Sequence, residues 1–293
     1  MDSVEFRLLS GRAIGVSEFG RRSSETVVVL AHPAPGSSRF DPDPAVTNRR
    51  NVRLIAVDRP GYGTSELLAD GGPGTVTDAA SDIAEYLAFQ GITRVGAVGW
   101  SAGGRVVLAL AAVYSALVGR LAVVATPAPD EEVPWVGTEN RERLGELSAL
   151  PAAAAVTALS DQLAKVVGER PSADALLRML SSDEADARLR EQARDRLAEM
   201  LDRAAMQGTT GMAADIVSYT LLHWGFDPAS VAAKTLLLYG GADQITGAHG
   251  RWYQKRIPHS RLETVKDVGH LLVVPMWDRI LSHVAPGSKM NGR

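Results

Sequence analysis

The five residues Gly99-Trp100-Ser101-Ala102-Gly103 decide the fold predicted for this chain. An apolar run over residues 94–98 precedes them and a helical run over residues 105–117 follows, so the order is strand, sharp turn, helix. In that context G-x-S-x-G marks a turn that lifts a serine hydroxyl above the end of a strand. The turn strains the serine backbone, and the flanking glycines leave room for strand and helix to pass each other. Ser101 is therefore the predicted nucleophile.

Other apolar runs indicate that this strand belongs to a parallel sheet. They cover residues 27–31, 53–57, 121–125, 236–239 and 261–265. Unbroken apolar runs are typical of parallel strands covered on both faces, and helical stretches such as residues 78–90 separate them. Residues 6–9 and 13–18 add an antiparallel hairpin. We therefore predict an α/β fold with a mostly parallel, doubly wound sheet of eight strands. Ligands should bind beyond the carboxyl ends of the strands.

Residues 130–225 interrupt this alternation of strands and helices. They carry 17 acidic and 10 basic side chains, a charge of −7, whereas the rest of the chain carries +4. Apolar residues recur there at helical spacing, as in residues 189–204. We expect a helical cap over residues 130–225, lying on a core formed by residues 1–129 and 226–293.

Composition limits the function classes that are open. The chain has 293 residues, 45% hydrophobic and 22% charged, which is typical of a soluble globular protein with room for such an insertion. A net charge of −3 suggests no nucleic-acid partner. The absence of cysteine excludes disulfides, thiolate metal sites and a cysteine nucleophile. We see no signal peptide or membrane-spanning run, so we expect a cytoplasmic protein without membrane association.

Distinctive loops follow the predicted strands in a fixed order. They are His32-Pro33-Ala34-Pro35-Gly36, residues 58–65, Gly240-Gly241-Ala242-Asp243 and Asp267-Val268-Gly269-His270. Together with the turn at Ser101, these segments resemble the α/β-hydrolase superfamily, and within it the cap-bearing serine hydrolases. The resemblance spans nearly the whole chain outside the predicted cap and implies an α/β-hydrolase fold.

The resemblance implies that Ser101 is the nucleophile, His270 the base and Asp243 the acid that orients it. A serine hydroxyl needs such a base within hydrogen-bond reach, and the base needs an orienting group. His270 is favoured because it follows a strand and a glycine and opens an apolar helix. Asp130, near the end of another strand, is the alternative acid.

The other histidines receive different interpretations. We expect His249 and His259 on the surface, and His32 bracing the loop before Ala34. The resemblance also implies an oxyanion hole made by the backbone N–H groups of Ala34 and Ala102. One departure from the pattern is proline at position 33, where relatives usually have glycine. Proline leaves the Ala34 donor in place but can tilt it.

A serine at this turn separates the chain from relatives that use aspartate there and favours acyl transfer. Hydrolysis of a small to medium, largely apolar ester is the first expectation. Thioester, amide or C–C bond cleavage, a ligand sensor with little turnover, and a cofactor-free perhydrolase are the alternatives. We expect a small-molecule substrate, no cofactor and no metal, and we leave monomer and homodimer both open. Candidates for contacts with substrate are Trp100, Trp135, Met200, Met206, Met212, His223 and Trp224.

Overall fold

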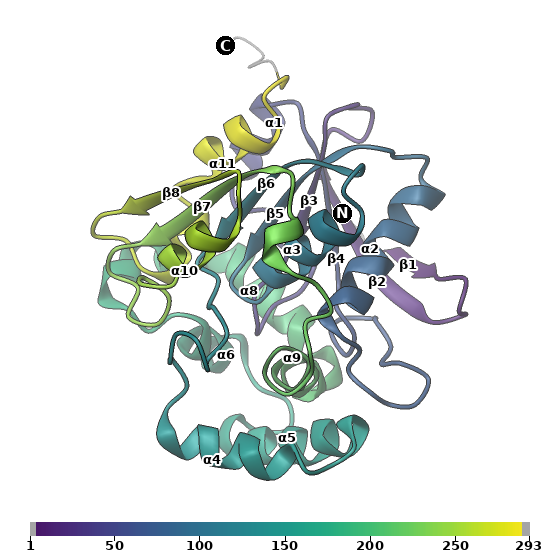
Figure 1. Cartoon of the computed structure of the whole chain (residues 1–293), viewed down its shortest axis with the longest axis vertical. Helices are drawn as coiled ribbons and strands as arrows, with labels where there is room; N and C mark the ends of the chain where they lie inside the picture. Colours follow the sequence, from purple (N-terminus) through teal and green to yellow (C-terminus); the bar gives the residue numbers. More distant parts are fainter. Residues whose placement is uncertain (1–3, 289–293) are drawn as a thin grey trace.

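The computed structural model describes residues 4–288 and confirms the predicted α/β sheet (Figure 1). The strands are β1 (Val4–Arg7), β2 (Ala13–Gly20), β3 (Val27–Ala31), β4 (Arg53–Val57), β5 (Val95–Trp100), β6 (Val118–Val124), β7 (Lys234–Gly240) and β8 (Ser260–Val265). They lie in the order β1-β2-β4-β3-β5-β6-β7-β8. Strand β2 pairs in antiparallel fashion with both β1 and β4, and the pairs among β3 to β8 are parallel. The parallel strands therefore end at one common edge.

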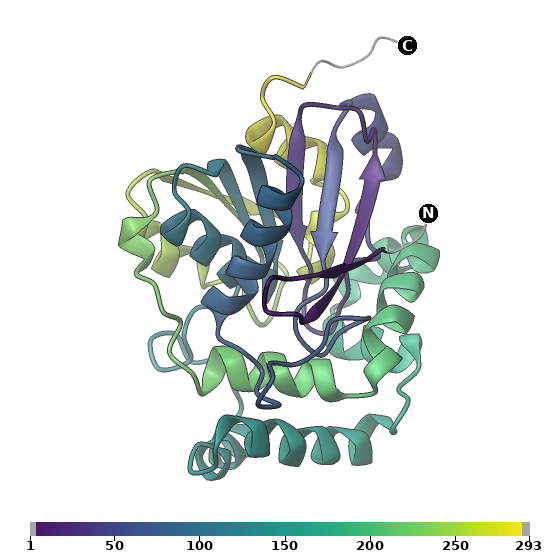
Figure 2. The same ribbon diagram turned by 90° about the vertical axis from the view of Figure 1, so that its right-hand side faces the viewer.

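Helices cover both faces of the sheet (Figures 1 and 2). The core helices are α1 (Pro44–Arg49), α2 (Val76–Phe89), α3 (Gly103–Val113), α10 (Gly250–Arg256) and α11 (Trp277–Val284), with a short 3₁₀ turn η4 (His270–Val273). Strand side chains alternate between the two faces: Val29 packs with α2, α3 and α10, whereas Val28 packs with α1 and α11. The helix expected to reach residue 117 ends at Val113, because the chain turns there to start β6 at Val118.

A helical segment between β6 and β7, which we call the insertion (residues 125–233), lies across the carboxyl edge of the sheet. It contains α4 (Thr138–Leu147), α5 (Ala152–Val167), α6 (Ala173–Leu180), η1 (Glu184–Asp186), α7 (Ala187–Gln192), α8 (Arg194–Ala204), η2 (Ala205–Gln207), α9 (Thr210–Thr220) and η3 (Pro228–Ser230). Figure 2 shows α9 between the sheet and α5.

The insertion is packed in two ways. Leu176 of α6 and Leu197 of α8 are buried in one cluster with Val98 and Trp100 of β5, so this part shares the core of the sheet. Helices α4, α5 and α9 bury a smaller cluster of their own, which includes Leu159. Helices α6 and α8 therefore pack directly on the sheet, and α4 and α5 form an outer layer. The domain boundaries at residues 130 and 225 stay a prediction.

Candidate active site

Ser101 lies in a sharp turn between β5 and α3, at the carboxyl edge of the sheet. Its φ is +55°, a left-handed conformation that is rare for a residue with a Cβ, and its N–H donates to the carbonyl of Val124 at 2.8 Å. Gly103 permits this turn, because a Cβ there would overlap the carbonyl oxygens of Ala31 and His32. Backbone strain of this kind is concentrated at functional sites. Ser101 is thus held above the strand ends.

Asp243 and His270 follow neighbouring strands and form a hydrogen-bonded pair. His270 Nδ1 lies 2.8 Å from Asp243 Oδ2. The same carboxylate accepts from the N–H groups of Ile245 and Thr246, at 3.0 and 2.9 Å, and from the Thr246 hydroxyl. Burial would raise the pKa of Asp243, but the hydrogen bonds and the charge of His270 outweigh it and lower the pKa to about 2. An ionised Asp243 favours the proton on Nδ1, which leaves Nε2 of His270 as the basic nitrogen.

The imidazole of His270 lies beside the turn that carries Ser101. Trp100 Nε1 donates to the His270 carbonyl at 3.0 Å, and the two rings lie 6.1 Å apart from centroid to centroid. Ser101 and His270 are only 8% and 7% exposed. Within residues 4–288 the Ser101 hydroxyl makes no hydrogen bond. The structure thus brings the two residues to one closed edge of the sheet without joining their side chains.

A buried arginine holds the loop after β3. Arg59 Nη1 and Nη2 donate to the carbonyls of His32 and Pro33 at 2.5 and 2.9 Å, and the Arg59 backbone N–H donates to His32 Nε2 at 3.2 Å. Burial and the charge of Arg59 lower the pKa of His32 well below its usual value. This ring is therefore neutral, and it braces the loop that leads into Ala34.

Asp215 of α9 compensates the buried charge of Arg59. Its two carboxylate oxygens bind Arg59 Nε at 2.8 Å and Nη2 at 2.5 Å. Neither residue was among the predicted site residues. A signal for Asp215 was present in the sequence, because it is the one acid in the otherwise apolar run of residues 212–217. Nothing in the sequence indicated that this acid would meet Arg59.

The backbone N–H groups of Ala34 and Ala102 donate no hydrogen bond within residues 4–288. Ala102 lines a cavity of about 20 Å³ together with Arg59, Asp215 and Tyr219. That volume has room for about one water molecule. Both donors are therefore available to a ligand, and the space beside Ala102 is small.

A larger cavity of about 250 Å³ lies within the insertion. Its walls come from α4, α5, α6 and α9 and are mainly apolar; they include Leu144, Leu147, Leu159, Leu163 and Ile216. Polar side chains such as Arg143 also line it. Tyr219 lines this cavity as well as the small one beside Ala102. Tyr219 is thus shared by the insertion cavity and the small cavity beside Ala102.

Of the residues expected to contact substrate, Trp135 lines this larger cavity and the other six do not. Trp100, Met200 and Met212 are buried in the core cluster that the sheet shares with the insertion. Met206 is 55% exposed, and His223 is also exposed, its Nδ1 accepting from the N–H of Gly225. Trp224 stacks on Phe226. Residue type alone did not distinguish packing from a cavity wall.

Two further expectations concern polar residues near the strand ends. Asp130 accepts from the N–H groups of Trp135 and Val136, both at 2.7 Å, and from Arg141, so its contacts belong to the insertion. His249 is buried, which corrects the expected surface position. Its Nδ1 accepts from the N–H of Ala128 at 2.9 Å, because it lies under the turn that leads into the insertion.

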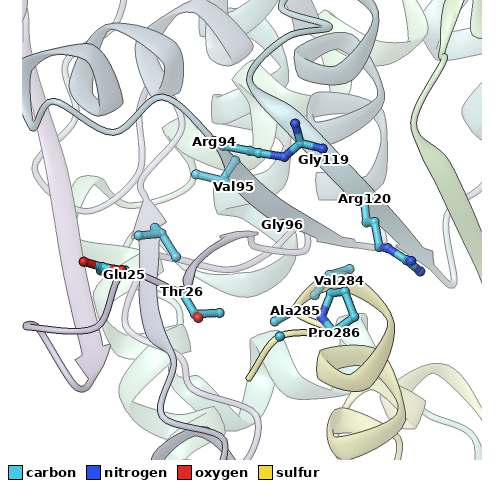
Figure 3. A pocket seen from close by; sticks show the side chains of 12 residues that line it. Glu25, Thr26, Arg94, Val95, Gly96, Gly119, Arg120, Val284, Ala285 and Pro286 are labelled. Atoms are coloured by element: carbon cyan, nitrogen blue, oxygen red, sulfur yellow. The ribbon is translucent and has the colours of Figure 1, made fainter. Parts of the chain in front are cut away.

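A separate depression of about 280 Å³ lies at the opposite edge of the sheet (Figure 3). Arg94, Val95 and Gly96 line it at the start of β5, and Val284 lines it at the end of α11. These are amino ends of strands, whereas Ser101 lies at the carboxyl end of β5. The depression therefore has no part in the candidate active site.

Two properties follow from the described part of the chain. Within residues 4–288, no helix is both long and apolar enough to pass through a membrane. The same residues contain no group of three or more His, Cys, Asp or Glu side chains placed to hold a metal ion.

Comparison with known proteins relates the chain to a family. Residues 28–282 match the family model described as "Alpha/beta hydrolase family". The chain is similar to the enol-lactonase from Burkholderia xenovorans LB400, with 21% identity and a TM-score of 0.69 over 97% of this chain and 98% of the other. It is also similar to a thermophilic esterase from Thermogutta terrifontis, with 19% identity and a TM-score of 0.68 over 98% of both chains. A third similar structure is a bromoperoxidase from Bacillus anthracis, with 18% identity and a TM-score of 0.68 over 96% of this chain and 98% of the other. At these identities the structures support the fold alone.

Proposed function

This chain belongs to the alpha/beta hydrolase family, and we propose that it is a serine hydrolase that cleaves small to medium, largely apolar esters. The observation that carries the proposal is the hydrogen bond of 2.8 Å between Asp243 and His270. It lies at the sheet edge where Ser101 is held with a positive φ. Nucleophile, orienting acid and base follow each other along the chain in the order typical of this fold.

The proposed reaction begins with the Ser101 hydroxyl attacking the ester carbonyl. His270 Nε2 takes the hydroxyl proton, and Asp243 stabilises the resulting imidazolium. The N–H groups of Ala34 and Ala102 bind the oxyanion of the tetrahedral intermediate. His270 then donates its proton to the leaving alcohol, and an acyl-enzyme forms on Ser101. A water molecule activated by His270 releases the acid and restores the serine.

We propose that the insertion acts as a cap and that its cavity of about 250 Å³ holds the apolar part of the ester. The leucine and isoleucine side chains of the wall favour alkyl or aryl groups, because their burial is driven by the hydrophobic effect. Tyr219, which lines both cavities, must turn aside for a substrate to reach Ser101 from this cavity. Trp135 is retained as a proposed substrate contact.

Two assays test the proposal. A fluorophosphonate probe should label the wild-type protein, and p-nitrophenyl esters of graded acyl length should be turned over repeatedly. Ser101→Ala should lose both labelling and turnover while its thermal midpoint stays within about 2 °C, a change of less than about 1 kcal/mol for a chain of this size. Ser115→Ala, an exposed serine just after α3, is the matched control and should behave like wild type. Equal labelling of Ser101→Ala and wild type would refute the proposal.

The same assays separate the alternatives. A ligand sensor predicts one slow acylation without repeated turnover. A perhydrolase predicts activity that depends on added peroxide, and a C–C hydrolase predicts cleavage of a β-diketone-like substrate in preference to esters. A cytoplasmic location stays a prediction that cell fractionation would test, and sedimentation would distinguish the monomer from the homodimer.

A further inference from the structure

A buried aspartate of the insertion accepts hydrogen bonds from the backbone on either side of His270. Asp186, at the end of η1, is fully buried. Its Oδ1 accepts from the N–H of Gly269 and its Oδ2 from the N–H of Leu271, both at 2.9 Å. The Ser181 hydroxyl donates to the same Oδ2 at 2.8 Å. Within residues 4–288 no ion pair involves this carboxylate, so backbone and hydroxyl dipoles hold it.

Gly269, which donates one of these hydrogen bonds, lies very close to the carboxylates of the insertion. A Cβ at position 269 would lie 2.7 Å from Asp186 Oδ2 and 2.9 Å from Asp183 Oδ2, so a side chain there would displace these carboxylates. The N–H groups of Gly269 and Leu271, on either side of His270, therefore both donate to one acid that belongs to the insertion.

The opposite side of His270 is held by the sheet. Its carbonyl accepts from Trp100 Nε1 at 3.0 Å, and its ring is bound to Asp243. His270 is the first residue of the short 3₁₀ turn η4, which follows β8, so it belongs to no regular strand or long helix. Its position therefore depends on these side-chain contacts, and the insertion supplies the ones to the backbone N–H groups.

We propose that Asp186 is a positioning residue that sets the distance of His270 from Ser101. Docking of the insertion on the sheet then places the catalytic base correctly. This proposal rests on the proposed function of His270. It makes the insertion more than a cover for substrate, because an insertion that lifts off the sheet removes the contacts of Gly269 and Leu271. Misplacing a catalytic group by about 1 Å costs about 10²-fold in rate.

The test uses Asp186→Asn in the full-length protein. The amide has one acceptor oxygen where the carboxylate has two, so its NH₂ group must face one of the two backbone N–H groups. We expect kcat per competent site to fall about 10- to 100-fold while KM changes less than about threefold. Competent sites are counted by the p-nitrophenol burst, so partial unfolding does not lower this ratio. The exposed insertion residue Asp202 provides the matched control, Asp202→Asn, which should match wild type.

A second readout does not depend on ester turnover. Protein labelled with ¹⁵N-histidine should show a low-field proton resonance for the hydrogen bond between His270 Nδ1 and Asp243. We expect Asp186→Asn to shift or broaden this resonance and Asp202→Asn to leave it unchanged. A wild-type protein that shows the resonance but hydrolyses no ester would end the proposed function and leave the positioning role open to this readout.

Unchanged kcat per site together with an unchanged resonance in Asp186→Asn would overturn the proposal. If that variant does not fold, Ser181→Ala takes its place, because it frees Oδ2 from one donor and leaves both backbone contacts. It should move both readouts in the same direction by a smaller amount. Ser181→Ala indistinguishable from wild type in both readouts would then overturn the proposal.

Discussion

The buried pair of Arg59 and Asp215 allows stability and catalysis to be separated by two substitutions. The two side chains are 6% and 9% exposed and share two hydrogen bonds. Removing one partner of such a pair costs about 3–5 kcal/mol, because a charge is left buried without compensation. Asp215→Asn keeps one acceptor oxygen, so we expect a loss of about 3 kcal/mol. That corresponds to a thermal midpoint lower by roughly 6–12 °C.

Catalysis should respond differently to the two partners. In Asp215→Asn, Arg59 still donates to the carbonyls of His32 and Pro33, so kcat should fall less than about tenfold. Arg59→Met loses those donors and frees the loop that presents the Ala34 N–H. The loss of one oxyanion donor costs about 10²–10³ in kcat, and we expect a fall in that range for Arg59→Met.

The assay combines urea unfolding, followed by tryptophan fluorescence, with kcat on one p-nitrophenyl ester. Glu139→Gln is the control, because Glu139 pairs with Arg143 on the exposed face of a helix and should add little stability. An Asp215→Asn protein within about 1 kcal/mol of wild type would refute the stability reasoning. An Arg59→Met protein with kcat within threefold of wild type would refute the role of Arg59 in holding the loop.

Two other predictions concern pH. Burial raises the pKa of Asp41 to about 6, so its ionisation lowers stability as pH rises from about 4 to 6, by up to about 3 kcal/mol. Asp41 Oδ1 accepts both hydrogen bonds, from the Asp43 N–H and the Thr47 hydroxyl, and asparagine keeps this oxygen. In urea unfolding, Asp41→Asn should therefore be more stable than wild type at pH 7 and equally stable at pH 4. A variant that is less stable than wild type at pH 7 would contradict this. The lowered pKa of Asp243 has the opposite sign: its contribution of about 2 kcal/mol is present above pH 4 and is lost as pH falls through about 2. Asp243→Asn should remove this acid-dependent loss and lower kcat by up to about 10⁴-fold, and an unchanged slope of stability between pH 4 and 2 would count against the assignment.

The fold was accessible from the sequence because its signals are local. Unbroken apolar runs such as residues 27–31 indicate buried parallel strands, and the glycines beside Ser101 indicate a turn that needs close backbone approach. The resemblance to the α/β-hydrolase superfamily implied Asp243 and His270, and their positions directly after predicted strands favoured the same residues. Strand ends of a parallel sheet meet at one edge, so order along the chain was enough to predict their neighbourhood.

Contacts within the insertion were not accessible in this way. Met200 and Met212 have the same side chain as Met206, yet the first two are buried and the third is exposed. The difference depends on which helix face meets the sheet, and helical periodicity gives the face but not its partner. His249 was misjudged for the same reason, because its neighbours in the sequence are not its neighbours in space.

Local sequence determined the order of the candidate catalytic groups along this chain: a serine in a strained turn, then an acid, then a histidine, each at a strand end. Tertiary structure alone decided that Asp186 and Asp215 of the insertion reach the turn of His270 and the guanidinium of Arg59. The physical reason is that hydrogen bonds between distant segments depend on how helices dock. A single buried acid in a helix or turn shows that a partner is needed, because a buried charge must be compensated, but does not say which partner it will have.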